Sequence, residues 1–252
     1  MTEDDRNRRY FLKVTALAGS ALILQACGNN ATTNVVNAKQ SPEKNTGSDE
    51  EAEEVTPLED LMREHGVLRR ALFVFSEAAA VLPHDPPGMW ADAIQKAAKL
   101  FREFGEDYHE KKLEEQFIFP LIKQKAPTGP AGSYPDILTA QHARGREITD
   151  YILASTAAGK IGANSTDLSK ALNGFVRMYD AHAAREDTIV FPAWKNLIKP
   201  DEYAELGEKF EDIEHEQFGE DGYENAVKQI AEIETSVGLD DISKLTPAGP
   251  PK

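Results

Sequence analysis

Residues 180–192, DAHAAREDTIVFP, contain the pattern that decides the fold. Four residues advance an α-helix by about 400°, so His182 and Glu186 lie only about 40° apart on one helix face. The same face carries apolar residues such as Phe175 and Ile189, and a carboxylate on an apolar face needs a partner. A metal ion bound by both side chains meets that need, so the stretch predicts a buried metal site on a long helix.

The second half of this stretch is repeated earlier in the chain. Glu114 and Glu115, followed by three residues and Phe-Pro, match Glu186 and Asp187, which are also followed by three residues and Phe-Pro. The repeat indicates two equivalent half-sites on two helices.

The earlier copy has a different spacing to its histidine. Glu110 lies four residues before Glu114, whereas His109 lies five before it and is turned by about 140° on an ideal helix. A π-bulge between about Tyr108 and Leu113 would bring His109 and Glu114 onto one face, and such bulges occur often at functional sites. We therefore predict His109 and Glu114 as metal ligands, with Glu110 as the alternative or an additional ligand.

The fold follows from four long segments with helical periodicity. Thr56, Pro57 and Glu59 form a capping box that begins the first segment, and Pro83 ends it. The others are expected at about 87–124, from about 133 to near 159, and at about 165–198, with shorter helices at about 201–218 and 222–237. No stretch alternates with period two for long enough to predict a strand. The predicted fold class is all-α, an antiparallel up-and-down four-helix bundle with extra C-terminal helices.

Each of the four long segments holds one histidine near its middle. A single histidine on a helix is more often a surface residue or a hydrogen-bonded core residue than a ligand. Four of them, one per helix and at similar depth, are expected to converge on the bundle axis: His65, His109, His142 and His182. The remaining two, His84 and His215, are expected at the surface.

Together these motifs resemble the haemerythrin and HHE cation-binding family over about residues 57–198. The resemblance implies two non-haem iron ions in the bundle, bridged by carboxylates and a solvent oxygen. The implied ligands are His65, His109, Glu114, His142, His182 and Glu186. Oxygen-carrying members have a further histidine one turn after the one matched by His142, where this chain has Arg146. That departure either leaves one iron more open or lets Glu110 compensate.

The N-terminus predicts export. Arg8 and Arg9 precede Phe-Leu-Lys and an apolar run at 14–24, which is typical of a twin-arginine signal. Leu-Gln-Ala-Cys at 24–27 resembles a bacterial lipobox, so Cys27, the only cysteine, is the predicted lipidation site, with ordinary cleavage near Ala26 as the alternative. A lipid-anchored periplasmic protein is expected, on a membrane that the sequence leaves open.

The predicted organisation has five parts. A signal peptide with its lipobox covers 1–27, a polar linker 28–55, the metal-binding bundle 56–199, a helical extension 200–240 and a loose tail 241–252.

Composition and charge limit the function classes. With 43 acidic against 28 basic residues the net charge is −15, which argues against nucleic acid as a partner. One cysteine excludes an internal disulfide and a zinc–thiolate site. Nitrogen and oxygen donors suit iron or manganese, and the resemblance implies two iron ions, with manganese or a mixed pair as the alternative.

The leading hypothesis is a di-iron protein that binds a small ligand such as O2, peroxide or NO, or buffers iron in the cell envelope. The alternatives are a di-iron oxidoreductase and a metal-free lipoprotein adaptor whose buried histidines are hydrogen-bonded in the core.

Overall fold

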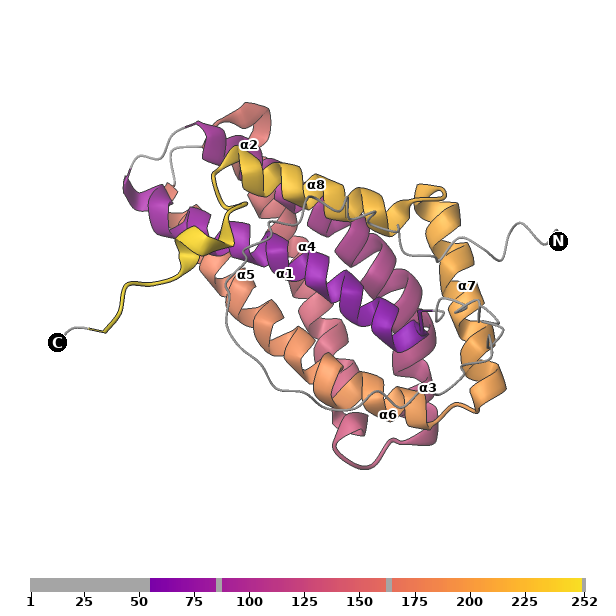
Figure 1. The fold of residues 1–252 in the computed structure, drawn as a ribbon. Coiled ribbons are helices and arrows are strands. Elements are labelled where there is room, and N and C mark those ends of the chain that lie inside the picture. The colour runs from indigo at the N-terminus through magenta and orange to yellow at the C-terminus, as the bar shows by residue number, and fades with distance from the viewer. Residues whose placement is uncertain (1–54, 85–87, 162–164, 251–252) are drawn as a thin grey trace, which may run out of the picture. The chain divides into compact units, whose positions relative to one another are not determined.

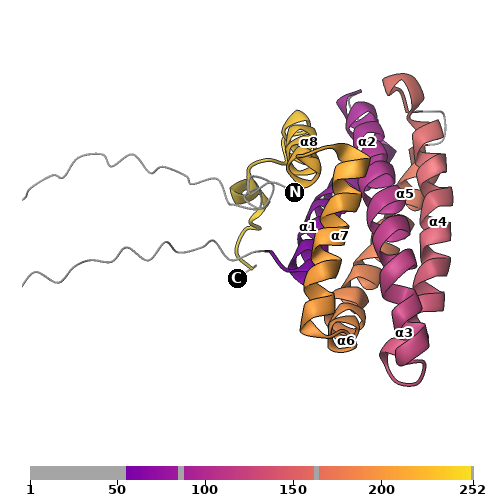
Figure 2. The same cartoon turned by 90° about the vertical axis from the view of Figure 1, so that its right-hand side faces the viewer.

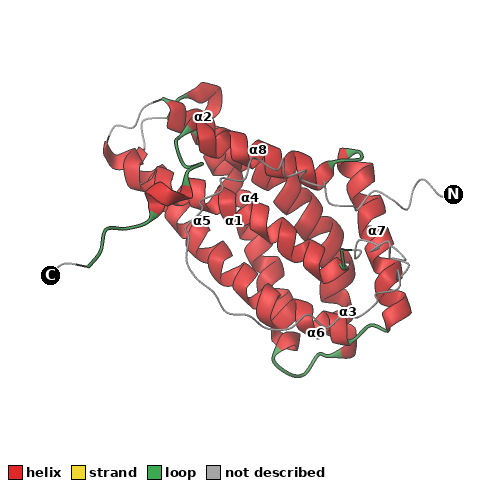
Figure 3. Ribbon diagram, viewed as in Figure 1, coloured by secondary structure: helices red, strands yellow, loops and turns green. Residues whose placement is uncertain are grey.

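The computed structural model describes residues 55–84, 88–161 and 165–250. These residues are helical with no strand, as Figure 3 shows. The predicted export signal, residues 28–54 of the predicted linker, and Cys27 lie outside the described residues. None of the helices in the described ranges combines the length and the apolar composition needed to cross a bilayer.

Four long segments form the predicted antiparallel bundle, and the all-α fold class is confirmed (Figure 1). Two of them are continuous runs built from α-helical and π-helical parts. The segments are α1 (Pro57–Val81), α2–η2–α3 (Met89–Leu100, Phe101–Ile118 and Phe119–Lys125), α4 (Tyr134–Ser155) and α5–η5–α6 (Ser165–Arg185, Glu186–Val190 and Phe191–Asn196).

The first helix begins where its capping box predicts. Glu59 N–H donates to the Thr56 hydroxyl at 3.3 Å, and Thr56 N–H donates to Glu59 Oε2 at 2.9 Å. Pro57 occupies the first helical position, where its missing N–H costs nothing. The sequence therefore fixes the start of α1 by local hydrogen bonding alone.

An aromatic cluster fills the bundle core. Phe175 packs edge-on against Phe75 and Phe101, with ring centroids 5.6 and 4.9 Å apart. Phe191 and Trp194 are also buried, whereas Phe73 and Phe117 are only partly buried. Burying side chains of this size stabilises the fold by about 1.5–3 kcal/mol each.

The C-terminal helices α7 (Pro200–Phe218) and α8 (Gly222–Ser236) pack on one side of the bundle (Figure 2). Phe210 of α7 stacks on Trp194, and the Tyr203 hydroxyl accepts a hydrogen bond from Leu58 N–H. On α8, Glu234 forms an ion pair with Arg70 of α1.

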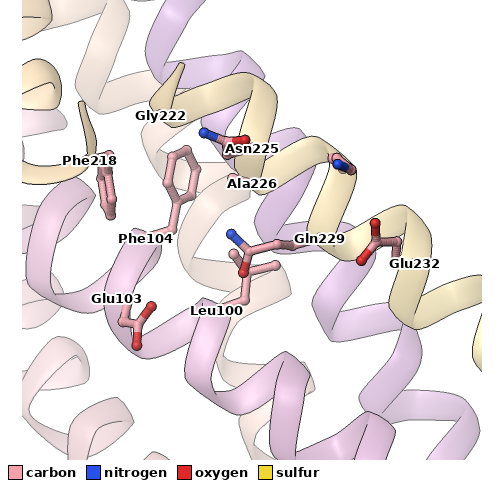
Figure 4. Close-up of a pocket in the computed structure, with 10 residues that line it drawn as sticks. Leu100, Glu103, Phe104, Phe218, Gly222, Asn225, Ala226, Gln229 and Glu232 are labelled. Carbon is pink, nitrogen blue, oxygen red and sulfur yellow. The ribbon is translucent and has the colours of Figure 1, made fainter. Parts of the chain in front are cut away.

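A groove of about 310 Å³ runs between α8 and η2 (Figure 4). Leu100, Phe104 and Phe218 form its apolar part. None of the predicted metal ligands lines it. The groove is therefore separate from the site that the histidines form.

Glu214 of α7 is a buried carboxyl that faces other acids. Burial first, and then the charges of Glu64, Asp60 and Glu224, raise its pKa from 4.5 to about 8. Because the folded-state pKa is the higher one, the folded protein keeps a proton there that the unfolded chain releases. The associated stability is complete below about pH 4.5 and is lost as pH rises through about 8.

Replacing Glu214 by glutamine removes this proton linkage. We expect the unfolding free energy of the wild type to fall relative to Glu214→Gln between pH 5 and 8, by at most about 1.4 kcal/mol per pH unit. Urea unfolding at matched metal loading measures the difference. Glu216→Gln, at an exposed position of the same helix, should show no such trend, and parallel pH profiles for wild type and Glu214→Gln would contradict the assignment.

Candidate metal centre

Each bundle segment contributes one buried histidine to the interior. His65 comes from α1, His109 from η2, His142 from α4 and His182 from α5. Their Nε2 atoms meet in two pairs, 3.0 Å apart between His65 and His109 and 3.1 Å apart between His142 and His182. The structure thus brings together the four imidazoles that the sequence predicted to converge. His84 is exposed and His215 is half-buried on α7.

Each imidazole is held through Nδ1 by an oxygen from a neighbouring segment. The contacts are His65 with Asp187 Oδ1 at 2.7 Å, His109 with Glu64 Oε2 at 2.5 Å, His142 with Glu115 Oε1 at 2.9 Å and His182 with Gln141 Oε1 at 2.9 Å. Because every partner presents an oxygen, each ring can donate a proton from Nδ1, which leaves Nε2 as the atom that a metal ion would bind once any proton on it is displaced. The two pairs of Nε2 atoms therefore face each other as candidate ligand atoms.

We call these four acceptors, Glu64, Glu115, Gln141 and Asp187, the acceptor ring, because they connect the segments in a closed circle. The α1 segment supplies the acceptor for the imidazole of η2, and η2 supplies the one for α4. In turn α4 supplies the acceptor for α5, and η5 supplies the one for α1. Each acceptor is the sequence neighbour of a predicted ligand.

Glu114 and Glu186 lie between the two imidazole pairs. Glu114 places Oε1 3.4 Å from His109 Nε2 and Oε2 3.3 Å from His142 Nε2. Glu186 places Oε1 3.0 Å from His182 Nε2 and Oε2 3.6 Å from His65 Nε2. Both carboxylates are fully buried, and within the described residues their four oxygens face the imidazole Nε2 atoms and accept no hydrogen bond from any other group. Each carboxylate is thus placed to bridge two cations.

The carboxylates of this cluster raise the pKa values of two of the imidazoles. Burial alone would lower the pKa of His109, but Glu114 and Glu64 together raise it well above its ordinary value. Burial is likewise outweighed at His142, whose pKa is raised to about 10 by Glu110, Glu114 and Glu115. Without metal, protons therefore neutralise the cluster, and a binding metal ion must displace them.

The donor set fits two metal ions. Two of the groups of mutually close donor atoms in the described residues share Glu114. One comes from His65, His109 and Glu114, and another from Glu114, His142, His182 and Glu186. Ligands at right angles around an ion with metal–nitrogen bonds of about 2.1 Å lie about 3.0 Å apart, which is the spacing of the paired Nε2 atoms. Cations would also partner the four buried carboxylate oxygens of Glu114 and Glu186.

Glu110 lies beside the cluster rather than within it. Its Oε1 accepts from the Tyr179 hydroxyl at 2.7 Å, and its Oε2 accepts from Arg146 at 3.0 Å. The nearest imidazole atom in ion-pair range is Nδ1 of His142, at 3.9 Å, and not an Nε2. Of the two alternatives that the sequence left open, the structure turns His109 toward the other donors and leaves Glu110 paired with Arg146 and Tyr179.

The π-helical turns explain how the acidic residues reach the centre. The predicted π-bulge near Tyr108 is present, but π-helical hydrogen bonding covers all of η2. A second π turn, η5, was not predicted and corrects the expectation of a regular helix at 165–198. In both copies the Phe before the proline donates its N–H to the carbonyl of the acidic residue five positions earlier, Glu114 or Glu186. The proline that follows has no N–H, so the backbone hydrogen bond that a regular α-helix would form from that residue is missing in any case.

A small cavity adjoins the cluster. It has room for about 20 Å³ and is lined by both Glu114 and Glu186, by His65, and by apolar residues such as Leu68, Leu72 and Phe101. A space of this size holds about one water-sized molecule. The cavity wall also carries Tyr179 and Glu110, which are hydrogen-bonded to each other.

Comparison with known proteins agrees with this geometry. The family model of the haemerythrin HHE cation-binding domain matches residues 56–194. An uncharacterized protein of Mycobacterium bovis and uncharacterized proteins of two Mycobacterium tuberculosis strains are each 38% identical over 247 residues, which cover 96% of this chain and 91% of each relative. No solved structure matches the chain.

The position of Tyr179 at the cavity depends on Gly145 of α4. A Cβ at residue 145 would lie 2.0 Å from the Tyr179 hydroxyl oxygen. Gly145→Ala should therefore displace Tyr179 and lower the unfolding free energy by about 1–3 kcal/mol, as measured by urea unfolding. Gly174→Ala, on α5 with no atom within 4 Å of the added Cβ, should instead stabilise the protein by about 0.5–1 kcal/mol. Equal stability of the two variants would contradict this packing role.

Proposed function

The chain belongs to the haemerythrin HHE cation-binding family, and from this premise we propose that it is a non-haem di-iron protein that binds a small ligand such as O2, peroxide or NO. The observation that carries the proposal is the pair of fully buried carboxylates, Glu114 and Glu186, whose oxygens face the Nε2 atoms of two imidazole pairs. Such charges are costly to bury unless cations partner them.

The chain's own residues would do three things in this function. The four imidazoles and two carboxylates would hold the ions, and the acceptor ring would keep the imidazoles in the binding tautomer. The small cavity would admit a diatomic molecule or peroxide and exclude larger substrates. When bound, the iron pair supplies reversible redox chemistry and a coordination position for the ligand.

Arg146 favours a function other than simple oxygen carriage. Its guanidinium donates to Glu110 and to Glu115 at 3.0 and 2.7 Å, so the position of the missing histidine is filled by an ion-pair network. A cation cannot ligate iron, and this leaves the His142–His182 side with two imidazoles and the bridging carboxylates. Peroxide turnover or oxygen reduction at a more open ion is the alternative function that this observation supports.

Anaerobic purification, metal quantification and an optical spectrum before and after exposure to air test the proposal. Two irons per chain and an oxo-bridge absorption band that responds to air are the expected result. Oxygen consumption or peroxide turnover by the loaded protein would indicate catalysis rather than binding. Protein without bound metal would leave the metal-free adaptor as the better reading.

Removing one imidazole tests the ligand set. We expect His182→Ala to reduce iron per chain and to lower the thermal midpoint together, because bound metal stabilises only the folded state. His84→Ala, at an exposed position, is the control and should retain both metal and midpoint. Loss of stability in His182→Ala without loss of metal would exclude a ligand role for His182.

We also propose that the protein is exported and lipid-anchored in the periplasm. The support is the sequence alone, with Arg8-Arg9 before an apolar run and the only cysteine, Cys27, at the lipobox. Cys27→Ala should abolish incorporation of labelled palmitate and move the protein from the membrane to the soluble periplasmic fraction. An unchanged membrane fraction in that variant would argue against lipidation at Cys27.

A further inference from the structure

The small cavity beside the candidate metal ligands reaches solvent at one residue. Twelve residues from three of the bundle segments line it, and eleven of them are buried. Arg69 of α1 is the exception, because 42% of its side chain is exposed. Among the described residues, the opening of the cavity therefore lies at Arg69, on the side where α1 packs against α5.

An ion pair between two segments closes this opening. The Arg69 guanidinium donates a hydrogen bond to Oδ2 of Asp187, which lies on η5. The other oxygen of Asp187, Oδ1, lies 2.7 Å from His65 Nδ1, and only 11% of the Asp187 side chain is exposed. The carboxylate is thus fixed within the bundle, whereas the long arginine side chain is the exposed partner that can move.

Arg69 is held less firmly than the arginine next to it. Arg70 donates to Glu234 of α8 through both Nε and Nη2, which is the two-point contact that fixes a guanidinium best. The described residues give Arg69 one hydrogen bond, through Nη2. Exposed ion pairs contribute little to stability, so this contact can open readily.

We propose that Arg69 is the gate of the cavity. Small molecules reach the candidate metal ligands when its side chain turns away from Asp187, and the closed ion pair excludes them. Exposed side chains change rotamer within picoseconds to nanoseconds, so the gate opens without movement of the bundle. A gate of this kind changes the barrier to entry and to exit equally and leaves the affinity unchanged. The identity of the entering molecule rests on the proposed function, whereas the opening itself requires no metal.

Binding of NO to the reduced, iron-loaded protein tests the gate, with both rate constants measured by stopped-flow absorption. Arg69→Ala should raise the association and dissociation rate constants together by about two- to fivefold, the range set by an exposed ion pair, and leave Kd unchanged. Arg69→Lys keeps a cation for Asp187 and should stay near the wild type. Arg144→Ala is the control, because Arg144 is another exposed, ion-paired arginine that does not line the cavity.

The salt dependence of the same rate provides a test on the wild-type protein. NO is uncharged, so ionic strength changes its entry only through the protein. Salt screens the exposed ion pair, since the Debye length falls from about 10 Å at about 0.1 M to about 3 Å at about 1 M. Entry should therefore become faster with salt in the wild type and stay constant in Arg69→Ala. A wild-type rate that does not change with salt would overturn the inference, even if the variant does not fold.

Deuterium exchange at the imidazole Cε1 positions tests the opening in metal-free protein. His65 and His182 line the cavity, whereas His142 does not. Exchange measured by mass spectrometry should become faster in Arg69→Ala at His65 and His182 and keep the wild-type rate at His142. An equal change at all three histidines, or no change at any, would overturn the inference.

Failure of the gate and failure of the proposed function give different results. Iron-loaded Arg69→Ala with wild-type rate constants, or with a changed Kd and an unchanged association rate, would overturn the gate and leave the function standing. Wild-type protein that holds no iron would overturn the proposed function, and the exchange of the imidazole protons would then decide on the gate alone.

Discussion

Two fully buried carboxylates that face only imidazole nitrogens among the described residues are the constraint on which the rest of the structure depends. Glu114 and Glu186 would cost several kcal/mol each in such a place if nothing positive met their oxygens. The neighbouring histidines place imidazole nitrogens, which can carry protons or bind metal ions, opposite these oxygens. The imidazoles turn Nε2 inward because the acceptor ring takes the Nδ1 protons, and the ring can close only if four helices lie at the right rotation and depth. The same contacts between helices therefore determine both the packing of the bundle and the geometry of the site.

The π-helical turns are the local means by which the backbone meets this constraint. In an α-helix, residues five apart point about 140° away from each other, which would separate His109 from Glu114. The wider turn of η2 brings both to one interior, and it ends at Phe119, immediately before a proline that could not have donated an N–H. The same arrangement recurs at η5. The repeated Phe-Pro pair thus determines the backbone hydrogen bonding at the end of each π turn, in addition to any role in packing.

Much of the fold could be predicted from the sequence because helix periodicity and capping are local properties. The capping box at Thr56, the four segments and the converging histidines all follow from spacing along the chain. The second π turn could not be predicted, since His182 and Glu186 are four residues apart and already share a face of a regular helix. The acceptor ring was missed for a different reason. Each member is next to a ligand in sequence and therefore about 100° away from it on the helix. Whether it reaches an imidazole depends on how two helices are rotated against each other, which no single segment encodes.

Arg146, which stands where the family pattern has a histidine, changes the surroundings of the site without changing the fold. Its guanidinium donates hydrogen bonds to Glu110 and Glu115. Two carboxylates that could have bound metal are therefore paired with Arg146 instead. Glu110 then has one oxygen free to accept from Tyr179, and this hydrogen bond forms part of the wall of the small cavity. The space beside the metal ligands is therefore bounded by a phenol and a carboxylate on one side and by apolar side chains on the other. A molecule in this space would meet these hydrogen-bonding groups together with the candidate metal ligands.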